Sequence, residues 1–485
     1  MDLSSLLHQR FGFTDFRPAQ RQVIDRIMDG ESVLAVMPTG SGKSLCYQLP
    51  ALALPGLTVV ISPLIALMKD QVDNLGRLGL PATVVNSTVS RDLQRSRLRR
   101  AIDGEIKLLY IAPERFQNDE FRSMLTRAEV SLLAVDEAHC ISLWGHDFRP
   151  DYLRLKDFAK DVRAARILAL TATATPAVRK DIVKQLGIER APQIVSGFDR
   201  PNLYLDVSEV TSVAEKVRAI AKAFRTEKLG IVYAGTRKNV EDLYGDLKRE
   251  GVDALAYHAG LPLQERRSVQ DKFMKAERCV IVATNAFGMG IDRREVRFVI
   301  HANIPASLEA YYQEIGRAGR DGKPAKCLLL FSYADKRIPE FLIDSNYPAP
   351  GMLKYVFNKL CRISTSSVLG EPWRKLAEKR DPQFEASISI LQRSGFLEKV
   401  NSSEGWGVRI LKPDDPDLKQ LDFKELEARR EFECRKLSVM LNYASRFRKH
   451  CFRSFILGYF GEWTGSRACE NCGRCAPEKK VSRPA

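Results

Sequence analysis

The sequence predicts an α/β protein with two tandem parallel-sheet lobes, followed by a winged helix and a small helical module. Two observations lead to this expectation. Short β-branched runs alternate with helical stretches along most of the chain, which is typical of parallel strands buried on both faces. The alternation stops near residue 345, and a helix-rich stretch that ends in crowded cysteines follows.

The expected strands form two sets. The strands of the first lobe are VLAVMP (33–38), TVVISP (58–63), LLYIAP (108–113), LLAVDEA (132–138) and ILALTAT (167–173). The strands of the second lobe are GIVYAG (230–235), DALAYH (253–258), CVIVATN (279–285), FVIHAN (298–303) and KCLLLFS (326–332). FDRPNLYLD (198–206) interrupts the rhythm between the two sets. We therefore expect the first lobe over residues 1–205 and the second over residues 206–345.

The C-terminal part has a different pattern. Residues 346–415 contain three helical stretches and then two short extended pieces around a turn, which favours a winged helix, a variant of the helix-turn-helix. A plain helical linker is the alternative. Residues 416–485 contain a long charged helical stretch that leads to the cysteines, so we expect a helical module there.

Charge and hydropathy limit the possible partners. The chain has 485 residues, a formal net charge of +16 and a pI near 9.4, which favours a polyanionic partner over a merely basic surface. No apolar run reaches the roughly 18 residues that a membrane span needs. The N-terminus lacks the features of a secretory signal. We expect a soluble, non-secreted protein with no membrane partner.

A glycine-containing loop follows the first strand. MPTGSGKS (37–44) resembles a phosphate cradle, because glycines turn backbone N–H groups toward a ligand and the loop leads into a helix N-terminus. In such a loop Lys43 reaches the terminal phosphates and Ser44 binds Mg²⁺. A chance glycine turn is the alternative for the loop alone. The candidate nucleotide-binding residues are Thr39, Gly40, Ser41, Gly42, Lys43 and Ser44.

Two carboxylates follow another apolar strand, in LLAVDEAHC (132–140). At the carboxyl end of a strand, Asp136 is suited to hold Mg²⁺ and Glu137 to orient the attacking water. His139 is a candidate γ-phosphate sensor or a contact between the lobes, with a structural role as the alternative. Together with the glycine loop, these residues predict a Mg-ATP-hydrolysing site.

The second lobe offers arginines for the transition state. YYQEIGRAGRDG (311–322) places Arg317 and Arg320 one helical turn apart, and Gln313 precedes them. Arginines that reach the phosphates across a cleft act as an arginine finger. A solvated helix with surface ion pairs is the alternative for this segment.

Four cysteines near the C-terminus have the spacing of a metal site. Cys451 is followed by ACENCGRC (468–475), which supplies Cys469, Cys472 and Cys475. Four thiolates at such spacing bind Zn²⁺ tetrahedrally and leave no open position for catalysis. An iron–sulfur cluster is the alternative that spacing alone leaves open.

With these motifs in view, residues 5–335 resemble the RecQ family of superfamily 2 DNA helicases, and CFRSFILGYFGE (451–462) resembles that family's zinc-binding subdomain. The resemblance rests on motifs that occur in order: FGFTDFRPAQ (11–20), MPTGSGKS, SPLIALMKDQ (62–71), YIAPER (110–115), DEAH (136–139), TATAT (171–175), YHAGL (257–261), ATNAFGMGID (283–292) and QEIGRAGRDG (313–322). It implies two RecA-like lobes, adenine recognition by Arg17 and Gln20, and 3′→5′ unwinding.

The segment CISLWGHDFRPDY (140–152) resembles the aromatic-rich loop of RecQ enzymes, with Leu143 in place of the family's usual glutamine. Aromatic and cationic side chains suit single-stranded bases, although packing between layers is the alternative. The candidates in this loop are Trp144, His146, Phe148 and Arg149. By the same resemblance, the candidate backbone contacts of the second lobe are Thr236, Arg237 and Asn285.

These observations predict a DNA-stimulated ATPase that unwinds duplexes in repair or recombination, with ATP, Mg²⁺ and Zn²⁺ as cofactors and single-stranded and duplex DNA as partners. Two alternatives remain at this stage. One is an ATP-gated nucleic-acid remodeler without processive unwinding, and the other is an RNA helicase. The expected location is a bacterial cytoplasm, at the nucleoid, or the nucleus of a eukaryote.

Overall fold

The computed structural model describes residues 2–63, 65–86, 89–145, 147–288, 293–363, 381–402, 405–445, 451–462, 465 and 468–476. The chain divides into two compact units. The main unit comprises residues 1–332 and 442–485, and the insertion unit comprises residues 333–441. The four-part division expected from the sequence stays a prediction.

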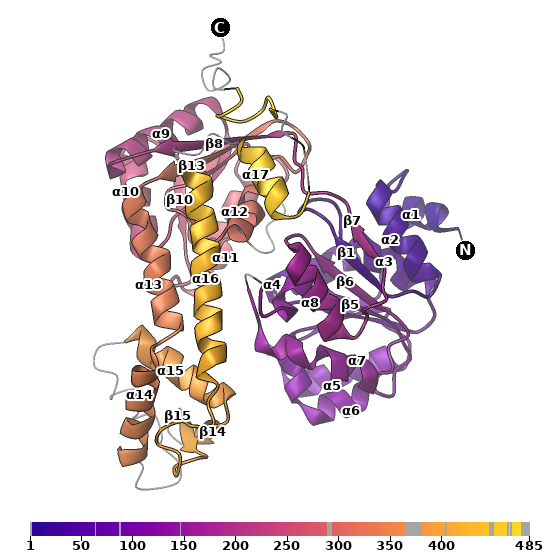
Figure 1. Ribbon diagram of the computed structural model, residues 1–485. Coiled ribbons are helices and arrows are strands. Elements are labelled where there is room, and N and C mark those ends of the chain that lie inside the picture. Colours follow the sequence, from indigo (N-terminus) through magenta and orange to yellow (C-terminus); the bar gives the residue numbers. More distant parts are fainter. Residues whose placement is uncertain are drawn as a thin grey trace. The chain divides into compact units, whose positions relative to one another are not determined.

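The first lobe of the main unit, residues 1–196, contains a parallel sheet with the order β3-β4-β2-β5-β6-β1-β7. Figure 1 labels four of its strands, β1, β5, β6 and β7. Its strands are β1 (Val33–Val36), β2 (Leu57–Ile61), β3 (Ala82–Val85), β4 (Leu108–Ile111), β5 (Val130–Val135), β6 (Ile167–Thr171) and β7 (Gln193–Val195). Its helices are α1 (Leu3–Phe11), α2 (Pro18–Met28), α3 (Leu45–Ala53), α4 (Ile65–Arg77), α5 (Arg91–Ile102), α6 (Asp119–Leu125), α7 (Leu155–Asp161) and α8 (Pro176–Leu186), with the 3₁₀ turns η1 (Pro113–Gln117), η2 (Ala138–Ile141) and η3 (Pro150–Arg154).

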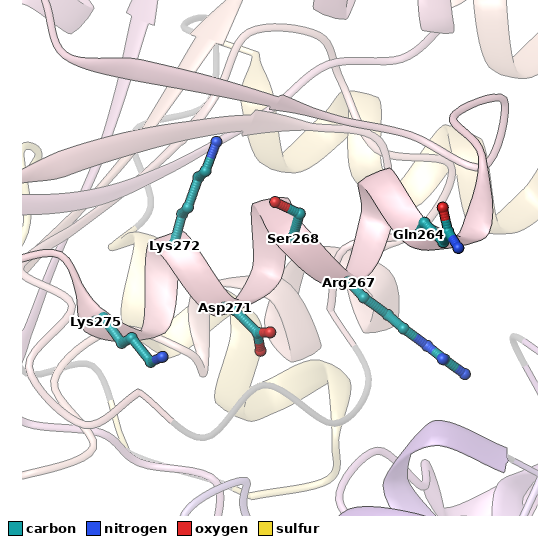
Figure 2. Close-up of a pocket in the computed structure, with 6 residues that line it drawn as sticks. All are labelled: Gln264, Arg267, Ser268, Asp271, Lys272 and Lys275. Atoms are coloured by element: carbon teal, nitrogen blue, oxygen red, sulfur yellow. The ribbon is translucent and has the colours of Figure 1, made fainter.

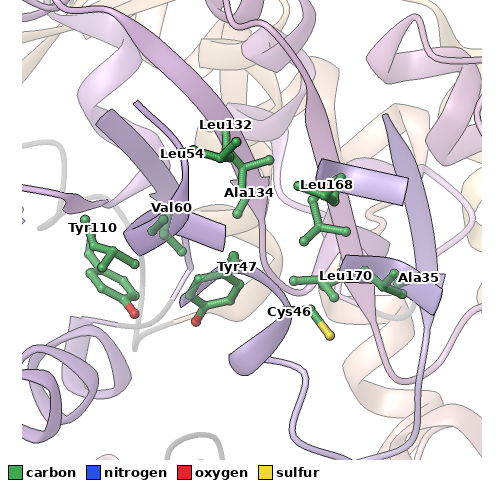
Figure 3. Packing of buried hydrophobic residues seen from close by; sticks show 14 of the residues in the cluster. Ala35, Cys46, Tyr47, Leu54, Val60, Tyr110, Leu132, Ala134, Leu168 and Leu170 are labelled. Carbon is green, nitrogen blue, oxygen red and sulfur yellow. The ribbon is translucent and has the colours of Figure 1, made fainter. Parts of the chain in front are cut away.

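The alternation of apolar residues along these strands builds two cores, one on each face of the sheet. On one face, Ala35, Tyr110 and Leu170 are buried against Tyr47 of α3, as Figure 3 shows. The intervening strand residues are buried toward the other face. A sheet covered in this way leaves only the ends of its strands for polar groups. The five strands expected in this lobe are confirmed.

The second lobe, residues 197–332, contains a parallel sheet with the order β10-β11-β9-β12-β13-β8. Its strands are β8 (Leu203–Glu209), β9 (Leu229–Tyr233), β10 (Ala254–Tyr257), β11 (Cys279–Ala283), β12 (Phe298–His301) and β13 (Ala325–Phe331). Its helices are α9 (Val213–Thr226), α10 (Arg237–Arg249), α11 (Leu263–Lys275) and α12 (Leu308–Ile315). The two parallel-sheet lobes expected from the sequence are therefore confirmed.

The C-terminal cysteines return to the main unit. Helix α17 (Phe452–Tyr459) and the turns around Cys469–Ala476 contact β8, where Leu205 forms a parallel bridge with Cys472. The Gly473 amide donates to the Leu205 carbonyl over 2.8 Å. We call residues 451–476 the thiol module, which packs on the edge strand of the second lobe.

The insertion unit has its own core. It contains η4 (Tyr333–Lys336), α13 (Arg337–Asn346), α14 (Pro350–Ile363), α15 (Pro382–Arg393), β14 (Leu397–Ser402), β15 (Gly405–Ile410) and most of α16 (Phe423–Ala444). Leu353 and Phe357 of α14 pack with Ile388 of α15 and with Phe396 and Val408. The antiparallel β14-β15 hairpin follows α15, as a winged helix requires. The expected helix PWRKLAEKR (372–380) lies outside the described residues, so the winged helix stays a prediction.

Within the described residues, the helices are all too short or too polar to cross a lipid bilayer.

Gly230 provides a stability test of the second lobe. It lies opposite Phe298 on the neighbouring strand, and a Cβ atom at Gly230 would collide with the Phe298 ring. Gly230→Ala should lower the free energy of unfolding by about 1–3 kcal/mol, because overpacking forces the ring and the backbone to shift. Gly245→Ala on α10 is the matched control: its Cβ would meet nothing within 4 Å, and it should gain about 0.5–1 kcal/mol of helix propensity. Urea unfolding of both variants measures the difference, and equal effects would contradict the predicted collision.

Candidate active site

The phosphate loop, residues 37–44, lies at the carboxyl end of β1 and leads into α3. Gly40 and Gly42 adopt φ values of 80° and 81°, which are costly for other residues. At Gly42 a side chain would also collide with the Gln20 amide. The loop therefore has the open backbone of a phosphate cradle, and open α/β sheets bind their ligands at this edge.

Arg17 and Gln20, at the start of α2, contact this loop. The Arg17 guanidinium donates to the Gly40 carbonyl over 2.6 Å. The Gln20 amide donates to the carbonyls of Ser41 and Gly42, each over 3.1 Å, and its oxygen caps the helix by accepting from the Arg17 amide. These bonds attach the N-terminal segment to the nucleotide loop. Adenine recognition by the two residues stays a prediction.

Lys43 is half-buried in the loop, where its ammonium donates to the Met37 carbonyl over 3.2 Å. Burial lowers the pKa of Lys43, while the negative charges of Glu137 and Asp136 oppose this shift. The same interactions place Lys43 close to the acidic pair, as a triphosphate site requires. Ser44 immediately precedes α3, at the position expected for a magnesium ligand.

Asp136 and Glu137 follow β5 at the same edge of the sheet. Burial raises the pKa of Asp136 to about 7, the negative charge of Glu137 adds to the rise, and Lys43 opposes it. A buried carboxylate beside a half-buried one suits a divalent cation, whose charge would favour their ionised forms. Glu137 has φ 49° and ψ 46°, a left-handed conformation that costs a non-glycine residue about 1–3 kcal/mol and that clusters at functional sites.

His139 lies inside the first lobe. Its Nδ1 atom lies 3.0 Å from the Thr171 hydroxyl oxygen, at the end of β6, and 3.3 Å from Glu137 Oε2. The side chain is 2% exposed. His139 therefore joins the acidic motif DEAH (136–139) to the threonine-rich motif that begins at Thr171, and its role in sensing phosphate stays a prediction.

The two arginines of the second lobe have different surroundings. Helix α12 ends at Ile315, so Arg317 and Arg320 lie in a turn, residues 316–320, and not on one face of a helix as expected. The helix ends here because two glycines, Gly316 and Gly319, follow it, and Gly319 adopts a left-handed φ of 55°. We call residues 316–320 the arginine turn. Arg317 is buried and donates to the Gly288 carbonyl.

Arg320 approaches the phosphate loop. A Cβ atom at Gly40 would lie 3.3 Å from Arg320 Cγ, and the Thr39 hydroxyl donates to the Gly316 carbonyl over 3.2 Å. The structure thus brings Arg320, Lys43 and the acidic pair into one region. Gln313 is half-buried on α12. The catalytic roles of these residues stay predictions.

The aromatic loop, residues 140–152, follows the acidic motif directly. Trp144 is 37% exposed and Phe148 is half-buried. Arg149 donates to Asp147 over 2.9 Å and to the Pro63 carbonyl over 3.0 Å, which ties the loop to SPLIALMKDQ. A Cβ atom at Gly145 would collide with the His139 carbonyl, so the loop backbone lies directly against the acidic motif. His146 lies outside the described residues.

The DNA candidates of the second lobe lie at the ends of strands. Thr236 caps α10 by accepting from the Asn239 amide over 3.0 Å. Arg237 lies next to Gly260 of YHAGL, and Asn285, after β11, is exposed. Their contacts with DNA stay predictions.

Two hollows lie outside this region. One, of about 450 Å³, lies in the first lobe beside Arg91, Gln94, Arg95 and Arg115. Gln94 on α5 accepts from Arg115 over 3.1 Å beside this hollow. The other lies along α11, and Figure 2 shows its six lining residues on that one helix. It lacks the groups from several elements that an active site needs.

The four cysteines at the C-terminus gather as expected. One sulfur from each residue lies within 4.8 Å of the others, and Cys451 Sγ lies 3.9 Å from Cys472 Sγ. Tetrahedral zinc with Zn–S bonds of about 2.3 Å requires sulfurs about 3.8 Å apart, so the set fits Zn²⁺. The Cys451–Cys472 hydrogen bond lowers the pKa of Cys451 and raises that of Cys472. The thiol module would hold the ion as a closed structural site.

Three family models match the chain. They are DEAD/DEAH box helicase over residues 17–182, Helicase conserved C-terminal domain over residues 215–322, and RecQ zinc-binding over residues 414–476. The third match includes α16 and the four cysteines of the thiol module.

Curated relatives match the same segments. The chain is 46% identical over 344 residues to "ATP-dependent DNA helicase RecQ" of Bacillus subtilis, a match that covers 70% of this chain and 58% of that protein. It is 44% identical to the RecQ of Haemophilus influenzae, covering 68% and 53%. It is 41% identical to "Probable ATP-dependent DNA helicase RecS" of B. subtilis, covering 70% and 69%. The chain thus spans little more than half the length of the two RecQ relatives.

Solved helicase structures share the fold. "Mycobacterium smegmatis helicase Lhr bound to ssDNA and AMP-PNP" aligns with a TM-score of 0.55 and 21% identity, over 84% of this chain and 60% of that one. "DEAD-box helicase Mss116 bound to ssRNA and UDP-BeF" aligns with a TM-score of 0.57 and 16% identity, over 80% and 89%. At these identities the likeness is evidence for the fold alone.

The thiol cluster leads to a test by metal analysis. Cys472→Ser should reduce bound zinc and lower the melting temperature, because three thiolates and a poorly matched hydroxyl do not replace four thiolates. Cys434→Ser, on α16 and outside the cluster, is the matched control and should keep the wild-type metal content. Elemental analysis with thermal unfolding measures both, and full zinc content in Cys472→Ser would exclude that residue as a required ligand.

Proposed function

Because the chain belongs to the RecQ family of helicases, we propose that it is a DNA-stimulated ATPase that unwinds duplex DNA with 3′→5′ polarity, in repair or recombination. The observation that carries the proposal is the approach of Arg320, from the second lobe, to the sheet edge that holds Lys43 and the acidic pair, next to an exposed aromatic loop. We further propose that it works in a bacterial cytoplasm, at the nucleoid where its DNA substrate would lie.

The residues have distinct tasks in ATP hydrolysis. The phosphate loop and Lys43 hold the β- and γ-phosphates, while Ser44 and Asp136 hold Mg²⁺. Glu137 orients a water for in-line attack on the γ-phosphorus, and the bond to the bridging oxygen breaks to give ADP and phosphate. Arg320 stabilises the charge that develops on the phosphoryl oxygens. Gln313, Arg317 and His139 shape this site from the two lobes.

We propose that bound DNA influences ATP hydrolysis through the aromatic loop. Trp144 and Phe148 offer faces on which bases stack, and Arg149 offers a cation. The polar residues of the second lobe, Thr236, Arg237 and Asn285, contact the phosphate backbone. Alternate closure and opening of the two lobes around ATP then moves the chain along a single strand.

A second candidate function has one observation in its favour. Leu143 replaces a polar residue in the aromatic loop, so the signal from DNA to the acidic motif lacks that hydrogen-bonding group. A weakly coupled enzyme would clamp and remodel DNA without processive unwinding.

The phosphate loop assignment is tested by Lys43→Ala. Hydrolysis should fall at least about 100-fold, because one preorganised cation at the transition state is lost. Lys160→Ala, an exposed residue of α7, is the matched control and should hydrolyse ATP at the wild-type rate. Phosphate release with saturating single-stranded DNA is the measurement, and wild-type activity in Lys43→Ala would rule out the assignment.

Substrate and polarity are tested by fluorescence unwinding. The protein should separate 3′-tailed DNA duplexes in the presence of ATP, and not 5′-tailed DNA or RNA duplexes. ATP hydrolysis without unwinding of any duplex would favour the remodeler, and unwinding of RNA duplexes alone would favour an RNA helicase.

The aromatic loop is tested by a pair of substitutions at Trp144. Trp144→Ala should raise the DNA concentration for half-maximal ATPase stimulation on the order of tenfold, since one stacked base contributes about 1–3 kcal/mol. Trp144→Phe keeps an aromatic face and should lie close to wild type. Equal stimulation curves for Trp144→Ala and wild type would place the DNA path elsewhere.

A further inference from the structure

The segment that opens the second lobe, residues 197–202, which we call the linker, contains an arginine that sequence reasoning missed. The Arg200 guanidinium donates to four backbone carbonyls on two distant segments. They belong to Thr39 (3.3 Å), Gly316 (3.4 Å), Ala318 (2.9 Å) and Gly319 (3.0 Å). The first lies in the phosphate loop and the other three in the arginine turn, so one side chain spans both halves of the candidate active site.

We infer that Arg200 is a positioning residue for ATP hydrolysis: its guanidinium fixes the spacing between the phosphate loop and the arginine turn, and thereby holds Arg320 at the loop. The inference rests on the proposed function and adds to it a residue outside the nucleotide motifs. Arg200 bonds to peptide carbonyls in this arrangement, so it acts through Arg320 and not on the phosphates.

The geometry explains why an arginine is needed. A guanidinium offers five N–H donors in a planar fork, whereas a lysine ammonium is a compact point charge. The Nη1 and Nη2 atoms of Arg200 each donate hydrogen bonds to two carbonyls. A single ammonium at the end of a flexible side chain cannot reproduce this arrangement. Hydrogen bonds from a charged donor contribute more to stability than bonds between neutral groups. The four bonds of Arg200 therefore stabilise the local arrangement of the phosphate loop and the arginine turn.

Neighbouring contacts define the same spacing independently. The Thr39 hydroxyl bonds to the Gly316 carbonyl, and a Cβ atom at Gly316 would collide with that hydroxyl. The Asn202 amide donates to the carbonyls of Gly319 and Lys323, each over 2.9 Å. The arginine turn is therefore fixed on one side by the phosphate loop and on the other by the linker.

The thiol module supports the linker from behind. Arg453 of α17 donates to the Arg200 carbonyl over 2.8 Å and to the Leu203 carbonyl over 2.6 Å, and it pairs with Asp199. Its side chain is 9% exposed. The backbone on both sides of Arg200 is thus attached to the module that carries the four cysteines.

Phe198, at the start of the linker, is held in a similar way. Its amide donates to the Glu462 carboxylate over 2.6 Å, and its ring stacks on Phe460 with centroids 4.4 Å apart. Its carbonyl accepts from the Tyr312 hydroxyl over 2.8 Å. The linker therefore runs between the thiol module and α12, which leaves Arg200 little freedom.

The first test separates positioning from nucleotide binding. Arg200→Lys and Arg200→Ala should lower kcat for DNA-stimulated ATP hydrolysis on the order of 100-fold, the scale expected for a misplaced catalytic group. The KM for ATP and the affinity for a fluorescent ATP analogue should change less than about twofold, because ground-state contacts remain. Zinc content and melting temperature are measured alongside. Arg190→Ala, an exposed residue beyond α8, is the matched control with wild-type kcat.

A double-mutant cycle with Arg320→Ala then tests the route of action. If Arg200 works by placing Arg320, adding Arg200→Lys to Arg320→Ala should reduce kcat less than about threefold further. Multiplied losses in the double variant would overturn the inference, as would wild-type kcat in Arg200→Lys. Should Arg200→Ala unfold early, Arg200→Lys carries the test, since it keeps charge and most of the bulk.

Arg453→Lys examines the support from the thiol module. It should retain zinc and lower kcat by a smaller factor than Arg200→Lys, because the Arg200 side chain is present but its backbone is less fixed. Unchanged kcat in Arg453→Lys would remove the thiol module from the inference. If the wild-type protein hydrolyses ATP while all Arg200 variants match it, the inference fails and the proposed function stands; a wild-type protein without ATPase activity overturns both.

Discussion

The nucleotide site depends on a small group of charges at one edge of the first sheet. Asp136 is buried and Lys43 and Glu137 are half-buried, and the loss of contact with water lowers the pKa of the Lys43 ammonium and raises that of Asp136. Buried charges are tolerated only with partners, so the site is stable because each group compensates the others. A metal-bound triphosphate would add charges of both signs to this set. The parallel sheet makes the arrangement possible, since its strands end side by side.

Much of this could be read from the sequence, because strands that end in polar groups mark the same edge of a sheet. The missed strands all lie at sheet edges: β3 and β7 have four and three residues, and β8, which overlaps the segment read as an interruption, has seven. They form through pairing with β4, β1 and β13, which local sequence does not encode. Arg317 and Arg320 looked equivalent in sequence. The glycines between them turn the backbone, so that Arg317 faces Gly288 while Arg320 faces the phosphate loop.

Arg200 and Arg453 were not predictable for a different reason. Their partners are mainly backbone carbonyls, which every residue has, so no motif identifies them. Their importance comes from the contacts between segments more than 100 residues apart. The predicted winged helix is the reverse case, because the sequence indicates a motif of which the structure describes only part. The exposed residues of α15 include Glu385 and Ser389 as well as Arg393, a mixed surface and not a basic one.

The glycine at position 145 has a mechanical consequence. With no side chain between the aromatic loop and the His139 carbonyl, the two backbones lie in close contact. On the proposed function, a base that displaced Trp144 would press on the peptide bearing His139, whose ring lies beside Glu137 and Thr171. Backbone packing at a glycine would then carry the response to DNA that the family's glutamine, here Leu143, would carry through a side chain.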